Sequence, residues 1–244
     1  MKSYKTSKLI LILAITASVF SACRKGGPWG IKGKGENVTE TRSATGFDQI
    51  DHSIDADIYY TQDSIYKVEI SAQPNILAVL KTEVKNGILF FDYRRNVWDH
   101  NTVKITIHAP KLKEIALSGS GDMNFQNEII AADMKIKISG LGEVYFPKLT
   151  AQNLNINISG SGSVKIADGA VKSENCEISG LGSVDALGLV AENAELEISG
   201  SGDMKVNVTE NLDISISGSG SVSYKGNPRL SKSISGSGKV IHLN

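Results

Sequence analysis

Residues 158–164 read Ile-Ser-Gly-Ser-Gly-Ser-Val, and this short stretch carries the pattern that decides the fold. The tetrapeptide Ser-Gly-Ser-Gly or Ser-Gly-Leu-Gly recurs at steps of 18 to 21 residues, starting at Ser118, Ser139, Ser159, Ser179, Ser199, Ser217 and Ser235. Self-similarity at such a period is typical of stacked repeat architectures. The sequence therefore predicts a repeat protein.

Apolar columns flank every tetrapeptide when the repeats are aligned. The column just before it holds Leu117, Ile138, Ile158, Ile178, Ile198, Ile216 and Ile234. The column two residues earlier holds Ile115, Ile136, Ile156, Cys176, Leu196, Ile214 and Lys232. Alternation with a period of two places both columns on one face of a strand, and the pattern recurs after the tetrapeptide. This pattern therefore predicts that each repeat forms two short strands around a glycine-rich corner.

Two all-β architectures satisfy this pattern. One is a parallel β-helix, or β-solenoid, with one repeat of about 20 residues per rung. The other is an antiparallel meander in which each tetrapeptide is a hairpin loop. A β-helix stacks equivalent residues directly above one another, which explains columns of like residues, so we favour it. Lys232 and His242 interrupt apolar columns and fit an exposed last rung.

Residues 45–117 precede the repeats of residues 118–244 and also have a β pattern. Apolar and polar residues alternate in the segments 56–61 and 66–70, and Asn86-Gly87 is a strong two-residue hairpin signal. Residues 74–79 begin with proline and fit one or two helical turns. We expect this region to form an N-terminal β cap on the solenoid.

The N-terminus has the form of an export signal. Residues 1–22 combine three lysines, an apolar run from Leu9 to Phe20 and the small pair Ser21-Ala22 before Cys23. This arrangement resembles the lipobox of bacterial lipoproteins, which implies a lipid on Cys23 and anchoring to the outer membrane. An ordinary signal peptide with an incidental cysteine is the alternative. Residues 23–44 are rich in glycine and polar residues and predict a flexible spacer.

Composition narrows the function classes. The chain has 26 Lys and Arg against 26 Asp and Glu, without the basic stripe that nucleic-acid binding requires. Its four histidines lack the spacing of metal ligands, so we expect no metal site and no cofactor. Cys176 occupies an otherwise mostly Ile and Leu column, which predicts a core residue rather than a nucleophile.

Several segments resemble a known family. Residues 46–50, 57–62 and 68–70, together with the repeated Ser-Gly-Ser-Gly followed by Asp or Ser, resemble the head GIN domain of autotransporter adhesins. The resemblance covers residues 45–244. It implies an exported bacterial protein, often a lipoprotein, with a right-handed β-helix-like fold. It transfers no functional residues.

Outward-facing acidic residues gather on consecutive repeats at Glu177, Glu195, Glu197 and Asp213. At the usual strand spacing of about 4.8 Å, these carboxylates would lie close enough to share a cation or a ligand. A solvated acidic face is the simpler interpretation. Neither arginine nor histidine accompanies the carboxylates, which argues against acid–base catalysis.

These observations favour a non-enzymatic lipoprotein of the cell envelope. We expect an adhesin-like or scaffolding module that binds a glycan or a protein, either at the cell surface or in the periplasm. The alternative is a carbohydrate-active enzyme, or a cation-dependent glycan-binding β-helix, that uses the acidic face.

Overall fold

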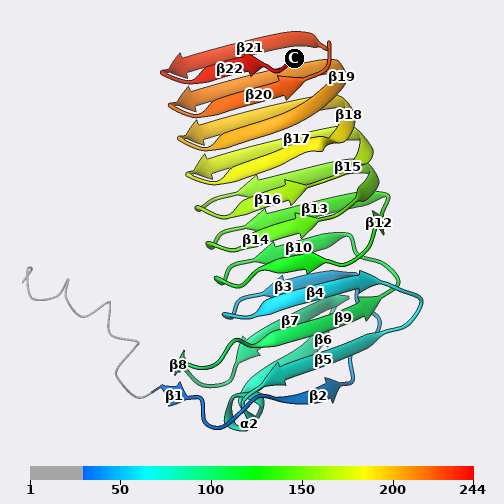
Figure 1. Cartoon of the computed structure of the whole chain (residues 1–244), viewed down its shortest axis with the longest axis vertical. Helices are drawn as coiled ribbons and strands as arrows, with labels where there is room; N and C mark the ends of the chain where they lie inside the picture. The colour runs from blue at the N-terminus through cyan, green and yellow to red at the C-terminus, as the bar shows by residue number, and fades with distance from the viewer. Residues whose placement is uncertain (1–29) are drawn as a thin grey trace, which may run out of the picture.

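The computed structural model describes residues 30–244, which form a tall all-β stack (Figure 1). Among the described residues, strands make up 65% and helix 2%, and the stacked parallel strands form a β-solenoid of about six turns. Within the described range, no helix has the length and hydropathy needed to cross a bilayer. The predicted signal peptide and Cys23 lie outside the described residues.

Successive repeats pair as parallel strands in register. Ile136 pairs with Ile156, and Ile156 pairs with Cys176 one rung further along the stack. The next two rungs continue this column with Leu196 and Ile214. The β-helix prediction is therefore confirmed. The antiparallel meander is wrong, because it would pair each strand antiparallel with the next strand in sequence, whereas here equivalent strands of neighbouring repeats pair in parallel.

The solenoid is built from strands on either side of the corners. Those that lead into a corner are β10 (Glu114–Leu117), β13 (Asp133–Ile138), β15 (Leu149–Ile158), β17 (Gly169–Gly180) and β21 (Arg229–Gly236). Those that follow a corner are β11 (Met123–Phe125), β14 (Glu143–Phe146), β16 (Ser163–Ile166), β20 (Ser221–Lys225) and β22 (Lys239–His242). The long strands β18 (Ser183–Gly200) and β19 (Asp203–Gly218) run from one corner to the next, and β12 (Ile129–Ile130) is a short link.

The N-terminal region supplies a first rung and closes the end of the stack. β3 (Gln49–His52) and β4 (Asp57–Gln62) pair in parallel with β10 and β11. On their other side lie β7 (Ile88–Tyr93) and β9 (Lys104–Ala109). Antiparallel pairing then adds β6 (Leu80–Lys85) to β7, and β5 (Lys67–Ala72) to β9. The change from parallel to antiparallel pairing ends the solenoid, as the expected cap requires.

Two local predictions in the cap agree with the structure. Asn86 and Gly87 have φ angles of 51° and 78° in the turn between β6 and β7, as a two-residue hairpin needs. The helix α2 (Pro74–Leu77) carries proline in its first turn.

The predicted spacer over residues 23–44 needs a correction. Within it, β1 (Ile31–Lys32) pairs with β8 (Val97–Asp99), and β2 (Val38–Arg42) pairs with β5. The Asn75 side chain also accepts from the Lys34 amide at 2.9 Å and donates to the Lys32 carbonyl at 2.8 Å. Residues 31–42 therefore belong to the folded domain. Their polar composition misled the prediction, because their backbone bonds to partners more than 25 residues away.

Glycine allows the corners of neighbouring rungs to approach closely. A Cβ atom on Gly140 would lie 2.0 Å from the Gly119 carbonyl oxygen of the rung below. The corners are linked by backbone bonds such as Ser139 N–H to the Leu117 carbonyl, at 2.9 Å. Inside, the apolar columns form one continuous core, in which Phe125 and Phe146 stack with their centroids 4.0 Å apart.

Candidate functional site

The four predicted carboxylates lie together on three neighbouring strands. Glu177 of β17 pairs in register with Glu197 of β18, and Glu195 of β18 pairs with Asp213 of β19. All four are exposed on the outer face of the sheet. The structure therefore brings these residues side by side, as the repeat alignment predicted.

This acidic face lines none of the three cavities described in this section. Beside it, Asn175 Nδ2 approaches Glu195 Oε2 at 3.5 Å. Over residues 30–244, no group of three or more His, Cys, Asp or Glu side chains is placed to hold a metal ion. A hollow of about 370 Å³ on the same sheet lies two rungs lower, beside Lys135 and Lys137.

A polar cavity of about 460 Å³, here called the cap pocket, lies at the N-terminal end of the stack. Its walls are the corner between β3 and β4, the end of β7, and β8 with the residues around it. The lining residues are Ser53, Ile54, Asp55, Asp92, Tyr93, Asn96, Val97, Trp98, Asp99 and His100. Sequence analysis missed this pocket, because its walls come from three separate segments that only the cap fold brings together.

Trp98 is the large aromatic residue of the cap pocket, and it is 62% exposed. Its indole Nε1 donates to the Gly30 carbonyl at 3.1 Å, and Lys32 Nζ lies 5.2 Å from the ring centroid. The Lys32 ammonium also pairs with Asp99 at 2.8 Å. Gly30 permits this packing, since a Cβ there would lie 2.6 Å from Trp98 Cδ1. The indole is therefore exposed and yet held in place.

A second cavity of about 600 Å³, here called the side groove, has a more apolar lining. It lies between the segment after β9 and the link around β12, with Pro110, Leu112, Ile130 and Ala131 among its walls. Ile130 is 63% exposed there, and Lys111 and Lys113 lie at the same groove. Gln62 fixes the edge of the groove by donating from Nε2 to the carbonyls of Pro110 and Ile130.

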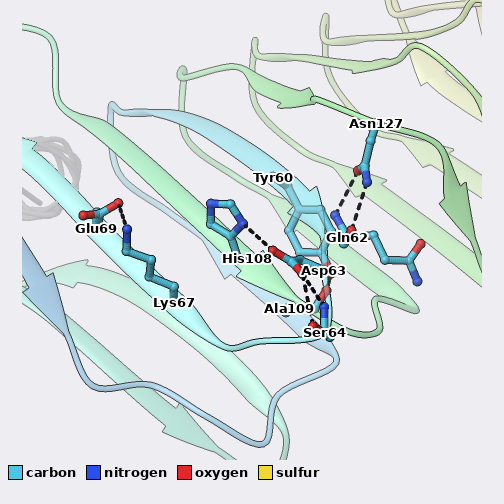
Figure 2. A network of polar contacts seen from close by, with 9 residues as sticks. All are labelled: Tyr60, Gln62, Asp63, Ser64, Lys67, Glu69, His108, Ala109 and Asn127. Atoms are coloured by element: carbon cyan, nitrogen blue, oxygen red, sulfur yellow. Dashed lines mark hydrogen bonds and ion pairs between the residues drawn. The ribbon is translucent and has the colours of Figure 1, made fainter.

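Beside the side groove, Figure 2 shows a network of polar side chains around Asp63. Asp63 lies between Ser64 and His108: its Oδ1 accepts from Ser64 Oγ at 3.3 Å, and its Oδ2 lies 3.3 Å from His108 Nδ1. In a Ser-His-Asp triad the histidine must lie between the other two residues and take the serine proton. Here the carboxylate occupies that place, so the network fixes the β4–β5 turn rather than activating Ser64.

Glu174 is an acidic residue inside the solenoid that the sequence analysis did not notice. It lies between Leu154 and Ala194 in an inward column and is 2% exposed. Burial raises the pKa of its carboxyl to about 7, and its Oε2 has no hydrogen-bond partner. The alternation that placed Cys176 and Ile178 in the core, extended by one step towards the N-terminus, would have identified Glu174 as buried.

Cys176 lies in the core beside Glu174, as predicted. Its Sγ is 3.5 Å from Glu174 Oε1, and burial together with the nearby carboxyl raises the pKa of the thiol well above its usual value. The thiolate is the reactive form of cysteine. The environment of Cys176 therefore suppresses nucleophilic chemistry.

Together these features define a class of protein, an all-β solenoid that offers polar and apolar surface cavities. The chain belongs to the family described as "putative auto-transporter adhesin, head GIN domain", whose sequence profile matches residues 46–228. The family predicted from the sequence is therefore confirmed. No curated protein matches the chain significantly.

Solved structures support the same fold. A "putative adhesin" from Bacteroides fragilis is 32% identical, with a TM-score of 0.83 over 88% of this chain and 100% of the other. A "putative lipid binding protein" from Parabacteroides distasonis is 27% identical, with a TM-score of 0.74 over 88% and 99% of the two chains. A "putative adhesin" from Parabacteroides merdae has the same fold, with 20% identity and a TM-score of 0.74 over 88% and 99%.

Proposed function

We propose that this protein is a non-enzymatic binding module of the cell envelope, lipid-anchored through Cys23, that acts in an adhesin-like way. The observation that carries the proposal is the similarity, at 32% identity, to an adhesin-like solenoid along the whole described domain. A solenoid offers a long, regular surface with fixed side-chain positions, which suits binding. The environments of Cys176 and Ser64 described above also favour binding over nucleophilic catalysis.

The anchor would hold the N-terminal end of the solenoid near the membrane. Only residues 24–29 separate Cys23 from the described chain, and extended backbone spans at most about 3.6 Å per residue. Gly30, where the described chain begins, would therefore lie within roughly 25 Å of the lipid surface.

Protease accessibility on intact cells tests this proposal. An adhesin-like role predicts that added protease cleaves the wild-type protein on intact cells, and that Cys23→Ala releases the protein from the membrane fraction. Permeabilised cells serve as the control for protease activity. Protection until permeabilisation would refute surface display, and an unchanged membrane association of Cys23→Ala would refute the lipid anchor.

A second candidate function is lipid binding at the side groove. Its apolar lining suits an acyl chain, and a 27% identical neighbour is described as a "putative lipid binding protein". A fluorescent fatty acid should bind wild-type protein and bind Ile130→Glu much more weakly. Leu181→Glu, at an equally exposed apolar residue of a distant corner, is a control. Equal binding by Ile130→Glu would remove this candidate.

The acidic face supports the remaining alternative, a carbohydrate-active enzyme or a cation-dependent glycan-binding module. It is favoured only by the carboxylates at Glu177, Glu195, Glu197 and Asp213 on neighbouring strands. The double variant Glu195→Gln and Glu197→Gln should then abolish polysaccharide turnover or Ca²⁺-dependent glycan binding. Unchanged behaviour would dismiss this alternative.

A further inference from the structure

The cap pocket lies where the column of corners begins. Stacking places Ser53-Ile54-Asp55-Ala56 beneath Ser118-Gly119-Ser120-Gly121, because a Cβ on Gly119 or Gly121 would meet the carbonyls of Ile54 and Ala56. Asp55 thus holds the corner position that is serine or leucine in every later rung. This first corner therefore differs from the repeat by carrying a carboxylate, and that carboxylate lines the pocket.

The Tyr93 hydroxyl in the pocket wall is buried and has no hydrogen-bond partner. Burial and the nearby Asp55 charge raise the pKa of Tyr93 to about 12, so the phenol keeps its proton at neutral pH. A buried polar atom without a partner is costly, and in native proteins it calls for an explanation. This oxygen is closed off from the cap pocket, so the ligand site does not depend on it.

The pocket offers mainly hydrogen-bond acceptors. The Asp92 carboxylate accepts one bond, from the Tyr93 amide at 2.7 Å, and Asp55 adds a second exposed carboxylate. His100 Nδ1 lies 2.7 Å from the Asn101 carbonyl, which can only accept, so in the neutral ring Nε2 is an acceptor. A fitting ligand must therefore bring several donors.

Charge and size restrict the ligand further. Three carboxylates line the pocket and neither lysine nor arginine does, so anionic ligands are repelled. The Asp99 carboxylate is already paired with Lys32. The volume of about 460 Å³ falls within the range of small-molecule sites. The exposed Trp98 ring gives a flat apolar surface whose position is already fixed, which lowers the entropic cost of binding.

We propose that the cap pocket binds a neutral saccharide, with a C–H face of one sugar ring on Trp98 and its hydroxyls donating to Asp55 and Asp92. A sugar ring combines an apolar face with many hydroxyl donors, which matches both halves of the pocket. This inference rests on the proposed binding function and assigns it a site and a ligand class.

A glycan array probed with detergent-solubilised full-length protein tests the inference, with affinities then measured by calorimetry. The array carries neutral glycans ending in mannose, galactose or N-acetylglucosamine, together with sialylated glycans and immobilised amines. We expect binding to neutral glycans and rejection of sialylated ones. Trp98→Ala and Asp55→Asn should each weaken binding roughly tenfold or more.

Tyr93→Phe changes the wall of the pocket without removing a contact to the ligand. It removes a buried oxygen that makes no bond in the free protein, so thermal stability should be unchanged or higher and affinity should stay near that of wild type. Asp203→Asn, an exposed carboxylate just after a distant corner, is the matched control and should bind like wild type.

Several outcomes would overturn the proposed site. Failure to bind any neutral glycan, preference for sialylated glycans or for amines, or unchanged affinity in Trp98→Ala and Asp55→Asn each contradicts it. Failure of the saccharide site can be distinguished from failure of the proposed adhesin-like function. Surface exposure without pocket-dependent glycan binding refutes only the pocket, and pocket-dependent binding by a protease-protected protein refutes only surface display.

Discussion

At the scale of single residues, Glu174 stands out because its environment conflicts with its chemistry. A carboxyl group in an apolar column loses its hydration. In the core, its hydrogen-bond partner is the Cys176 thiol. Desolvation favours the neutral acid, which is why its pKa rises from 4.5 to about 7. The solenoid therefore carries a titrating group in its interior.

Glu174 should make stability depend on pH in a defined direction. Because the folded pKa exceeds the unfolded one, the unfolded state ionises first, and stability present below pH 4.5 is lost as the pH rises to about 7. Glu174→Gln should abolish this dependence and be more stable than wild type at neutral pH by up to roughly 3 kcal/mol. Urea unfolding of both proteins at pH 4.5 and 7.5 measures the difference. Parallel pH profiles would contradict the assignment.

At the scale of elements, the glycine-rich corners are the part of the solenoid that least tolerates a change of residue. Parallel strands on neighbouring rungs bring their corners into backbone contact, so a side chain is excluded at Gly140 by the Gly119 carbonyl. Gly35 offers a contrast within the same protein. Its φ of 80° strains any side chain, but nothing lies within 4 Å of its added Cβ.

Replacing each of these two glycines by alanine should distinguish the stability lost through steric exclusion from the stability lost through backbone strain. Gly140→Ala forces two rungs apart and should destabilise the protein by at least about 2 kcal/mol. Gly35→Ala introduces only local strain and should cost about 1 kcal/mol. Thermal and urea unfolding provide the comparison. Equal losses at both positions would show that the rungs tolerate separation.

Residues 31–35 begin the folded domain, and only a few contacts hold this segment in place. Asn75 bonds both to Lys32 and to Lys34, and Gln73 donates to the Gly35 carbonyl at 2.9 Å. Asn75→Ala should raise hydrogen exchange in residues 31–35 several-fold, because an isolated hydrogen bond contributes about 1 kcal/mol. The melting temperature should change little. Protection that survives the substitution would mean that Gln73 and the pairing of β1 with β8 are enough to hold the segment.

At the scale of the whole molecule, the two ends of the stack differ. At the N-terminal end, β5 and β6 pair antiparallel with β9 and β7 and close the stack, whereas the last described rung exposes Ile234 and Ile241 at 40% and 45%. A stack of repeats is stabilised mainly by contacts between neighbours. The last rung has one neighbour within the described chain, and a middle rung has two.

This difference predicts a gradient of local stability along the stack. Amide hydrogens of β21 and β22 should exchange faster than those of β15 and β17, because the terminal rung can open without disrupting the others. Hydrogen-exchange mass spectrometry resolves these segments. Uniform protection would indicate either global unfolding as a single unit or a partner that covers the last rung in solution.

The sequence by itself determined the solenoid. Columns of isoleucine, leucine and valine at a constant offset from each Ser-Gly-x-Gly corner predict stacked parallel rungs, because residues of one column must share one buried line. The same alignment predicts that Glu177 lies beside Glu197, and the strand register agrees. Asn86-Gly87 likewise predicted its hairpin, since that signal is local.

The tertiary structure alone decided the cap and its pocket. β1 and β2 lie in a polar segment without periodicity, and their order comes from pairing with β8 and β5 far along the chain. The cap pocket joins a corner near Asp55 to a tryptophan more than 40 residues away. In the repeat region, spatial neighbours can be predicted because equivalent residues of successive repeats lie side by side in every rung. The cap has no repeat, so only its folded contacts determine which residues meet.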